Sequence, residues 1–217
     1  MDFSKRKSTT VVLEGFVIFL IAHALGGYYC APKLAEAFPT MPQLTVAMLS
    51  SSTISPGIAL LYLALRTKFI PRFNIKREAF ISILPGIIMA WIVVFVSVLL
   101  SGKESPFGQE ILKTPPPYYY LNLFLLILFG PFLEESLNRG YFFEVLRQGW
   151  GNTKALLFSS VLFVIPHGIW GSFDISLLFI FLYSLVFTLT YMQGGLIASI
   201  LVHIFVNCYL LYLNTGL

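Results

Sequence analysis

The sequence predicts an all-α membrane protein, a polytopic bundle of helices that crosses a lipid bilayer several times. Hydrophobic residues make up 57% of its 217 residues, and charged residues make up only 11%. Because a soluble domain carries about 25% charged residues, this composition excludes an ordinary water-soluble surface. A helix needs about 20 apolar residues to cross the bilayer core, so the chain has room for about seven spans, or eight at most.

Seven apolar runs are each long enough to form such a span, and together they describe a single membrane domain of residues 1–217. None of the runs alternates polar and apolar residues with the period of a strand. An open sheet would also leave backbone groups unpaired in lipid, so helices are expected throughout. The expected spans are residues 11–29, 44–65, 81–100, 119–139, 155–173, 175–192 and 196–213.

Basic residues gather on alternate sides of these runs, which predicts the orientation of the chain. Lys5, Arg6 and Lys7 precede the first run, and a second basic group within residues 66–77 follows the second run. The positive-inside rule then places the N-terminus in the cytoplasm, and seven spans place the C-terminus outside. We therefore expect an integral protein of the plasma membrane, with its net charge of +4 used for topology and for contacts with the lipid bilayer. Aromatic and basic residues do not interleave, so no nucleic-acid partner is expected.

Ionisable side chains inside the runs are the candidates for function, because each costs roughly 3 kcal/mol or more at the centre of a membrane. For two of them in the first run, Glu14 and His23, a structural role is the preferred interpretation. Glu14 lies near the cytoplasmic end of that run, where it can pair with the basic N-terminus. The others are Glu134, Glu135, Arg139, His167 and His203.

The fourth run contains two adjacent glutamates and an arginine. Adjacent residues on a helix point about 100° apart, so Glu134 and Glu135 should face different partners. Arg139 follows Glu135 by four residues and can pair with it on one face. Glu134 is then left without a local cation, and such a carboxylate suits a general base. The alternative is that the three groups form an inert buried ion-pair cluster.

The fifth and seventh runs each place two side chains of interest four residues apart. Phe163 and His167 share one face of the fifth run, where Pro166 should kink the helix and release a carbonyl. His203 and Asn207 share one face of the seventh run. This second pair can form an oxyanion pocket or a plain hydrogen-bonded contact between helices.

The depth of these groups in the membrane is similar if the fourth helix continues to about Arg147. Glu134 and His167 then each lie roughly 20 Å from the cytoplasmic ends of their helices, and His203 lies roughly 12 Å from its own. All three would meet in one cavity open to the cytoplasmic side. If the fourth helix ends at Arg139, the two glutamates are shallower and the match is looser.

The three motifs together resemble a known family. They read Glu134-Glu135-x-x-x-Arg139, then Phe163-x-x-x-His167, then His203-x-x-x-Asn207, in this order on three late apolar runs. This pattern is similar to that of the CPBP family of intramembrane glutamic endopeptidases. The family includes the type II CAAX prenyl endopeptidases and the bacterial Abi or bacteriocin-processing proteins. The resemblance covers residues 132–207, and residues 1–118 contribute only compatible hydrophobicity.

The resemblance implies an intramembrane, metal-independent endopeptidase with its catalytic helices in residues 119–217 and its N-terminal helices in residues 1–118. Glu134 and His167 would activate water, while Glu135 and Arg139 would brace the site. His203 and Asn207 would stabilise the oxyanion of the tetrahedral intermediate. The implied partner is a membrane-associated peptide or protein substrate, with no cofactor. The sequence predicts neither the oligomeric state nor whether the substrate is prenylated.

Three other interpretations remain open at this point. Glu134, His167 and His203 are possible zinc ligands, but no HExxH motif is present and zinc would still need a separate base. A non-catalytic immunity or scaffold protein could keep the same polar cluster for assembly. A proton-coupled transporter is the weakest alternative, because the chain is short and shows no inverted repeat.

Overall fold

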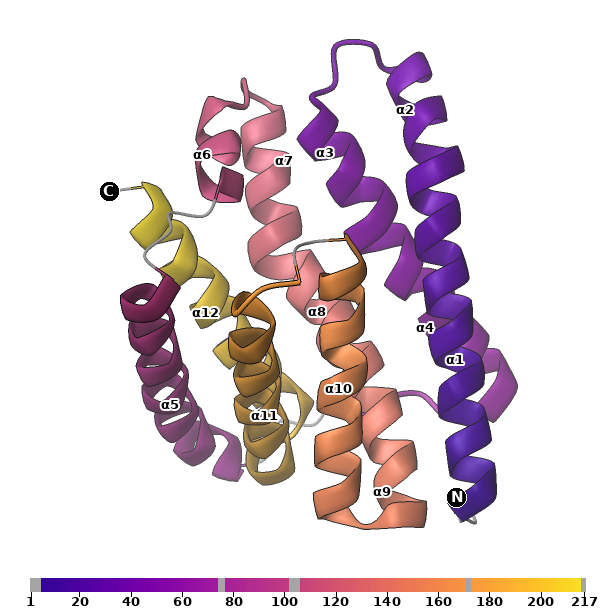
Figure 1. Cartoon of the computed structure of the whole chain (residues 1–217). Coiled ribbons are helices and arrows are strands. Elements are labelled where there is room, and N and C mark those ends of the chain that lie inside the picture. The colour runs from indigo at the N-terminus through magenta and orange to yellow at the C-terminus, as the bar shows by residue number, and fades with distance from the viewer. Residues whose placement is uncertain (1–4, 74–76, 102–105, 171–172, 216–217) are drawn as a thin grey trace.

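The computed structural model describes residues 5–73, 77–101, 106–170 and 173–215, and all regular elements in these ranges are helices. Figure 1 shows most of them aligned along one direction in a single bundle, with the N-terminus at one end. This arrangement confirms the all-α polytopic bundle expected from the composition. Within these ranges, six helical stretches are long and apolar enough to cross a membrane.

Two long rods form the N-terminal side of the bundle. The first rises from the N-terminus as a continuous helix, and the second returns beside it (Figure 1). The first rod comprises α1 (Lys5–Leu25), the π-helix η1 (Gly26–Cys30) and α2 (Ala31–Ala37). The second comprises α3 (Gln43–Ala47), the π-helix η2 (Met48–Ile54) and α4 (Ser55–Thr67).

A carboxylate ties these two rods together. Glu14 on α1 accepts hydrogen bonds from the Tyr62 hydroxyl, at 3.2 Å, and from Arg66 Nε, at 3.1 Å, both on α4. Glu14 therefore has the structural role that was expected. The partners that the structure gives it lie at the basic end of α4, because α4 runs antiparallel to α1 and brings Arg66 to the same level. The side chains of Lys5 and Arg6 lie outside the described part of the chain.

The C-terminal two thirds of the chain form the rest of the bundle. After α5 and the short α6, one continuous helical stretch runs from Tyr118 to Trp150. It comprises α7 (Tyr118–Phe124), the π-helix η3 (Leu125–Phe129), α8 (Gly130–Glu135), the π-helix η4 (Ser136–Phe143) and α9 (Glu144–Trp150). The remaining elements are α5 (Arg77–Ser101), α6 (Pro106–Lys113), α10 (Asn152–Trp170), α11 (Ser176–Gly194) and α12 (Leu196–Thr215).

This continuous stretch settles the length of the helix that carries the paired glutamates. The helix does not end at Arg139 but continues eleven residues further, to Trp150, where Gly151 with a φ of 76° ends it. Of the two expected ends of this helix, Arg139 and about Arg147, the later one is therefore correct. Glu134 consequently lies well inside the bundle and not near one of its ends.

The fifth apolar run forms a helix, α10, which packs between α9 and α11 (Figure 1). The six candidate spans found among the described residues correspond to the other six expected runs. Residues 171 and 172, at the end of the fifth run, lie outside the described residues.

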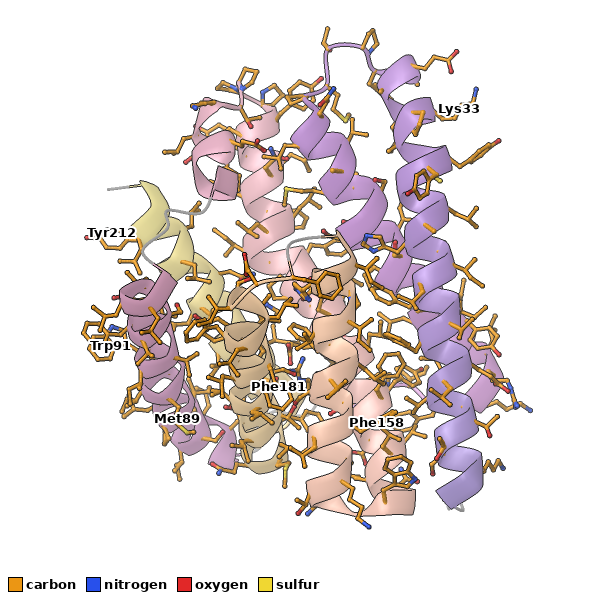
Figure 2. All side chains as sticks on the ribbon, viewed as in Figure 1. Lys33, Met89, Trp91, Phe158, Phe181 and Tyr212 are labelled. Atoms are coloured by element: carbon orange, nitrogen blue, oxygen red, sulfur yellow. The ribbon has the colours of Figure 1, made fainter. Side chains whose placement is uncertain are left out.

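Two apolar cores hold the bundle together, and the outer faces remain apolar. One core joins α1, α4, η4, α9 and α10, and the other joins α5, α11 and α12. Figure 2 shows Met89 and Trp91 projecting from the outer face of α5, where each is 44% exposed. Large apolar side chains exposed on the outside of a helical bundle are the surface expected to face lipid.

A glycine allows the segment after α4 to pack against η4. A Cβ atom at Gly140 would lie 2.8 Å from Cβ and 2.9 Å from Cγ of Pro71. The neighbouring Tyr141 hydroxyl donates a hydrogen bond to the Phe69 carbonyl in the same segment. The glycine that follows the motif arginine is therefore explained by this close approach, which no local sequence signal revealed.

We expect Gly140→Ala to lower the free energy of unfolding by about 1–3 kcal/mol, because the added methyl group overpacks a rigid proline ring. Gly57→Ala is the matched control, since no atom lies within 4 Å of a Cβ atom at that position. Thermal unfolding of the detergent-solubilised protein measures both effects. Equal unfolding midpoints for the two variants would contradict the close packing at Gly140.

Candidate active site

The two adjacent glutamates occupy the end of α8, a short α-helical segment between two π-helical turns. Such turns interrupt the regular hydrogen-bond ladder and often occur at functional sites. Glu135 is completely buried, whereas the Glu134 side chain keeps 28% of its surface exposed. Glu134 and Glu135 therefore lie in different environments, because the side chains of adjacent helical residues point about 100° apart.

Glu135 is the centre of a buried hydrogen-bond network that joins three elements. Its Oε1 accepts from Arg139 Nη1 at 2.9 Å and from His203 Nδ1 at 2.9 Å. Its Oε2 accepts from the Ser199 hydroxyl. Three donors satisfy this carboxylate, and they fix α12 against the end of α8. The expected pairing of Glu135 with Arg139 is confirmed.

Arg139 extends the same network to α11. Its Nη2 donates to the Ser184 carbonyl at 2.9 Å and to the Ser184 hydroxyl at 2.7 Å, and its Nε donates to the Thr188 hydroxyl at 3.3 Å. The guanidinium also lies over the Phe163 and Phe187 rings, at 4.7 Å and 5.4 Å from their centroids. A buried cation needs this full set of donors and aromatic faces to offset its loss of hydration.

His203 lies between the two glutamates. Its ring stacks on Phe187 at a centroid distance of 4.5 Å, and its Nδ1 forms a hydrogen bond with Glu135. Because a carboxylate only accepts, the Nδ1 atom carries the hydrogen. The opposite ring atom, Nε2, lies 4.0 Å from Glu134 Oε2.

The hydrogen bonds from Arg139, Ser199 and His203 all go to Glu135, as separate environments for the two glutamates predict, but His203 also approaches Glu134. His203 faces both carboxylates, because a planar ring with nitrogens on two edges can bridge side chains that point about 100° apart. Glu134 also has a potential cation within reach, supplied by a distant helix and not by its own.

His167 is held by its own helix. Its Nδ1 lies 2.8 Å from the Phe163 carbonyl, and its ring lies 5.0 Å from the Phe163 ring. A carbonyl only accepts, so the hydrogen is on Nδ1 and, in the neutral imidazole, the lone pair is on Nε2. The spacing of four residues thus prepares His167 to act as a base or as a hydrogen-bond acceptor.

Glu134 and His167 both line a cavity of about 350 Å³. Four segments form its wall: α1, the junction of η2 with α4, the α8–η4 segment, and α10. Among the contacts of the described residues, no direct hydrogen bond or ion pair joins Glu134 to His167. Two polar groups that line one cavity without touching leave space for a water molecule between them.

Asn207 is placed on α12, one turn beyond His203. Its Nδ2 donates to the Leu126 carbonyl in η3 at 2.9 Å. This places the amide beside the π-helical turn that precedes α8. The structure thus brings Glu134, Glu135, Arg139 and His203 into one cluster, and His167 shares the cavity that Glu134 lines. Asn207 is held by the backbone of η3.

Sequence reasoning assigned no contact at this site to three polar groups, although Ser199 was noted for its resemblance to the last motif of the family. His23, which was assigned to structure alone, lines the cavity together with Glu134 and His167. Asn138 also lines it, and its Nδ2 donates to the Glu134 carbonyl at 2.9 Å. Ser199 binds Glu135. The available signal was the helical spacing, since Asn138 follows Glu134 by four residues and Ser199 precedes His203 by four.

Across the described ranges, no group of three or more histidine, cysteine, aspartate or glutamate side chains is arranged to hold a metal ion.

The fold and the site define a class of protein: an integral membrane protein with a cluster of carboxylates and histidines inside its helical bundle. Residues 116–209 match the family model of the Rce1-like type II CAAX prenyl endopeptidases. This segment contains all three motifs and makes up less than half of the chain, which is similar to that CAAX protease family over these residues. The resemblance identified from the motifs is confirmed. Neither a curated protein nor a solved structure matches the chain.

We expect Arg139→Ala to lower the free energy of unfolding by about 3–5 kcal/mol, because it leaves the Glu135 carboxylate buried without its cation. The matched control is Glu36→Ala, which breaks the exposed Lys33–Glu36 pair and should cost about 1 kcal/mol or less. Unfolding in mixed micelles under increasing denaturant measures both. Similar losses in the two variants would show that the buried network does not stabilise the fold.

Proposed function

We propose that this protein is an intramembrane endopeptidase that hydrolyses a peptide bond of a membrane-associated protein or peptide. The observation that supports this most is the shared cavity of Glu134 and His167. The Glu134 side chain remains partly exposed, whereas the Glu135 carboxylate is buried and fully hydrogen-bonded within the network. The match of residues 116–209 to the family model of type II CAAX prenyl endopeptidases supports the same conclusion.

In the proposed reaction a water molecule binds between Glu134 and His167. Glu134 takes a proton from this water, His167 orients it through the Nε2 lone pair, and the water oxygen attacks the scissile carbonyl carbon. The tetrahedral intermediate then collapses, and the C–N bond breaks as the proton returns to the departing amine nitrogen. General-base assistance of this kind contributes about 10²–10⁴ in rate.

The oxyanion of the intermediate needs hydrogen-bond donors at the site where its charge develops. We assign these donors to His203, when it is protonated on Nε2, and to Asn207. The Asn207 amide has two N–H donors, and Leu126 accepts only one of them. Glu135 supports this role because its carboxylate stabilises a positive charge on the His203 ring.

Glu135 and Arg139 are proposed to position the site and not to react. They connect α8, η4, α11 and α12, so the spacing between the water-activating groups and the oxyanion donors depends on them. The catalytic helices would thus be those of residues 119–217, and the N-terminal helices of residues 1–118 would supply the remaining cavity wall.

The proposed substrate is a peptide that reaches the cavity from the membrane. Most of the cavity wall is apolar, including Leu162 and Phe163 on α10, which suits a lipid-anchored or membrane-embedded segment. The family model is named for prenylated CAAX proteins, so a farnesylated peptide is the first probe to test. We further propose a plasma-membrane location, a cytoplasmic N-terminus and a cavity that opens toward the cytoplasm, as the distribution of basic residues predicts.

We expect Glu134→Gln to reduce cleavage at least about a hundredfold while the unfolding midpoint stays near that of the parent, because the amide keeps the shape of the side chain but cannot take a proton. Glu36→Gln, at an exposed position, is the control and should cleave normally. Membranes containing each protein are compared by mass spectrometry for new peptide ends, and a farnesylated fluorogenic CAAX peptide gives the rate. Full activity in Glu134→Gln would end the assignment of Glu134 as the base.

Activity should survive removal of divalent metal ions, since the proposed base and oxyanion donors all come from side chains of this chain. The measurement is the cleavage rate after treatment with EDTA and with 1,10-phenanthroline, together with the metal content of the purified protein. A rate that is lost with the chelator and restored by stoichiometric zinc would contradict the metal-independent mechanism.

A further inference from the structure

The α8–η4 wall of the cavity carries a second polar side chain beside Glu134. Asn138 lines the cavity together with Glu134 and His167, although only 8% of its surface is exposed. It follows Glu134 by four residues, so the two side chains share one face of the same helical stretch. The proposed reaction uses Glu134 and leaves the Asn138 amide without a task.

One atom of the Asn138 amide is held by its own helix. Its Nδ2 donates a hydrogen bond to the Glu134 carbonyl at 2.9 Å. A carbonyl oxygen only accepts, so it is the amide nitrogen, and not Oδ1, that faces the helix. Among the described residues, this carbonyl is the one hydrogen-bond partner of the amide. Asn138 therefore keeps one acceptor, Oδ1, and one further N–H donor on a side chain that lines the cavity.

The neighbours of Asn138 on this wall are apolar, which makes an amide costly there. Leu137 and Phe142 line the cavity from the same segment, and α10 adds Leu162 and Phe163. A leucine at position 138 would continue this apolar surface. An amide that is nearly buried with unmade hydrogen bonds loses free energy instead, unless a ligand with a matching donor and acceptor enters the cavity.

A peptide backbone is such a ligand, because each peptide group carries one N–H donor and one C=O acceptor. A membrane-embedded peptide must open its helix around the bond that is cleaved, and the freed groups then need partners inside the cavity. Asn138 lies one helical turn, roughly 6 Å, from Glu134 along the helix axis. An extended peptide advances roughly 3.3 Å per residue, so the amide reaches a peptide group one or two residues from the attacked bond.

We propose that Asn138 is a substrate-binding residue, whose amide hydrogen-bonds a backbone peptide group of the substrate one or two residues from the scissile bond. This inference rests on the proposed endopeptidase function and adds to it a contact with the substrate backbone. Such a contact does not depend on the side chains of the substrate. Asn138 therefore contributes similarly to the binding of peptides that differ in sequence.

The test uses the full-length protein in nanodiscs and a fluorescein-labelled, farnesylated CAAX peptide as the probe. Binding is measured by fluorescence anisotropy in the Glu134→Gln background, where the peptide is not consumed. Asn138→Leu nearly keeps the shape of the side chain but removes its donor and acceptor. Ser136→Ala is the matched control, because the Ser136 hydroxyl also donates to a carbonyl four residues earlier, that of Phe132, but lies outside the described lining of the cavity.

We expect the probe to bind about tenfold more weakly to Asn138→Leu and within about twofold of the parent to Ser136→Ala, because only the first variant loses hydrogen bonds to the ligand. In the catalytically active background, Asn138→Leu should raise KM about tenfold with little change in kcat, since the contact is made in the ground state and in the transition state alike. The unfolding midpoint of Asn138→Leu should equal or exceed that of the parent. A midpoint that falls, or a loss of kcat at constant KM, would overturn the binding role.

The outcomes separate this inference from the proposed function. If the parent cleaves the probe and Asn138→Leu binds it as tightly as the parent does, the binding role is overturned and the peptidase remains. If the protein never cleaves the probe but Asn138→Leu still loses binding, the peptidase proposal fails and Asn138 remains a peptide-binding residue. Failure of the Glu134→Gln parent to bind the probe at all overturns the role of Asn138 as well.

Discussion

The buried contact between Glu135 and Arg139 is the interaction on which the rest of the site depends. Both side chains are almost completely excluded from solvent. Arg139 uses its other donors on α11, and Glu135 uses its other oxygen and a lone pair on α12. Two charges that are costly to bury therefore hold three helices in register. If either is removed, the other becomes an unpaired ion in the centre of the bundle.

This network also explains how two adjacent glutamates acquire different tasks. Glu135 accepts three hydrogen bonds, whereas Glu134 faces the cavity and has the His203 Nε2 edge at 4.0 Å. His203 links the two, since one ring edge is fixed by the structural carboxylate and the other is directed at the proposed catalytic one. The orientation of the reactive groups thus depends on a residue pair that does not react.

Much of this arrangement could be predicted from the sequence, because it follows from helical periodicity. Spacing by four residues correctly paired Glu135 with Arg139 and placed Phe163 beside His167. Six of the seven expected apolar runs form long candidate spans among the described residues, and the fifth run forms the helix α10. Helical periodicity could not predict the contacts between helices. The bridge from His203 to both glutamates depends on how α12 packs against α8, and no pattern within one helix reports that.

The position of His23 in the cavity wall shows the same limit more clearly. Within α1 it is a single histidine in an apolar run, for which a structural role is the ordinary interpretation. Only the packing of α1 near α10 and η4 brings it to the cavity wall. Likewise Gly140 follows the motif arginine in the sequence, but its reason lies in Pro71, which is 69 residues away along the chain.

The most direct measurement of this account compares the unfolding free energies of Glu134→Ala and Glu135→Ala, prepared and denatured side by side in the same micelles. The account predicts that Glu135→Ala loses about 3–5 kcal/mol, because Arg139 is left as a buried unpaired cation. It predicts that Glu134→Ala remains within about 1 kcal/mol of the parent, because that carboxylate is partly exposed. Equal losses, or a larger loss in Glu134→Ala, would contradict the division between a supporting and a reacting glutamate.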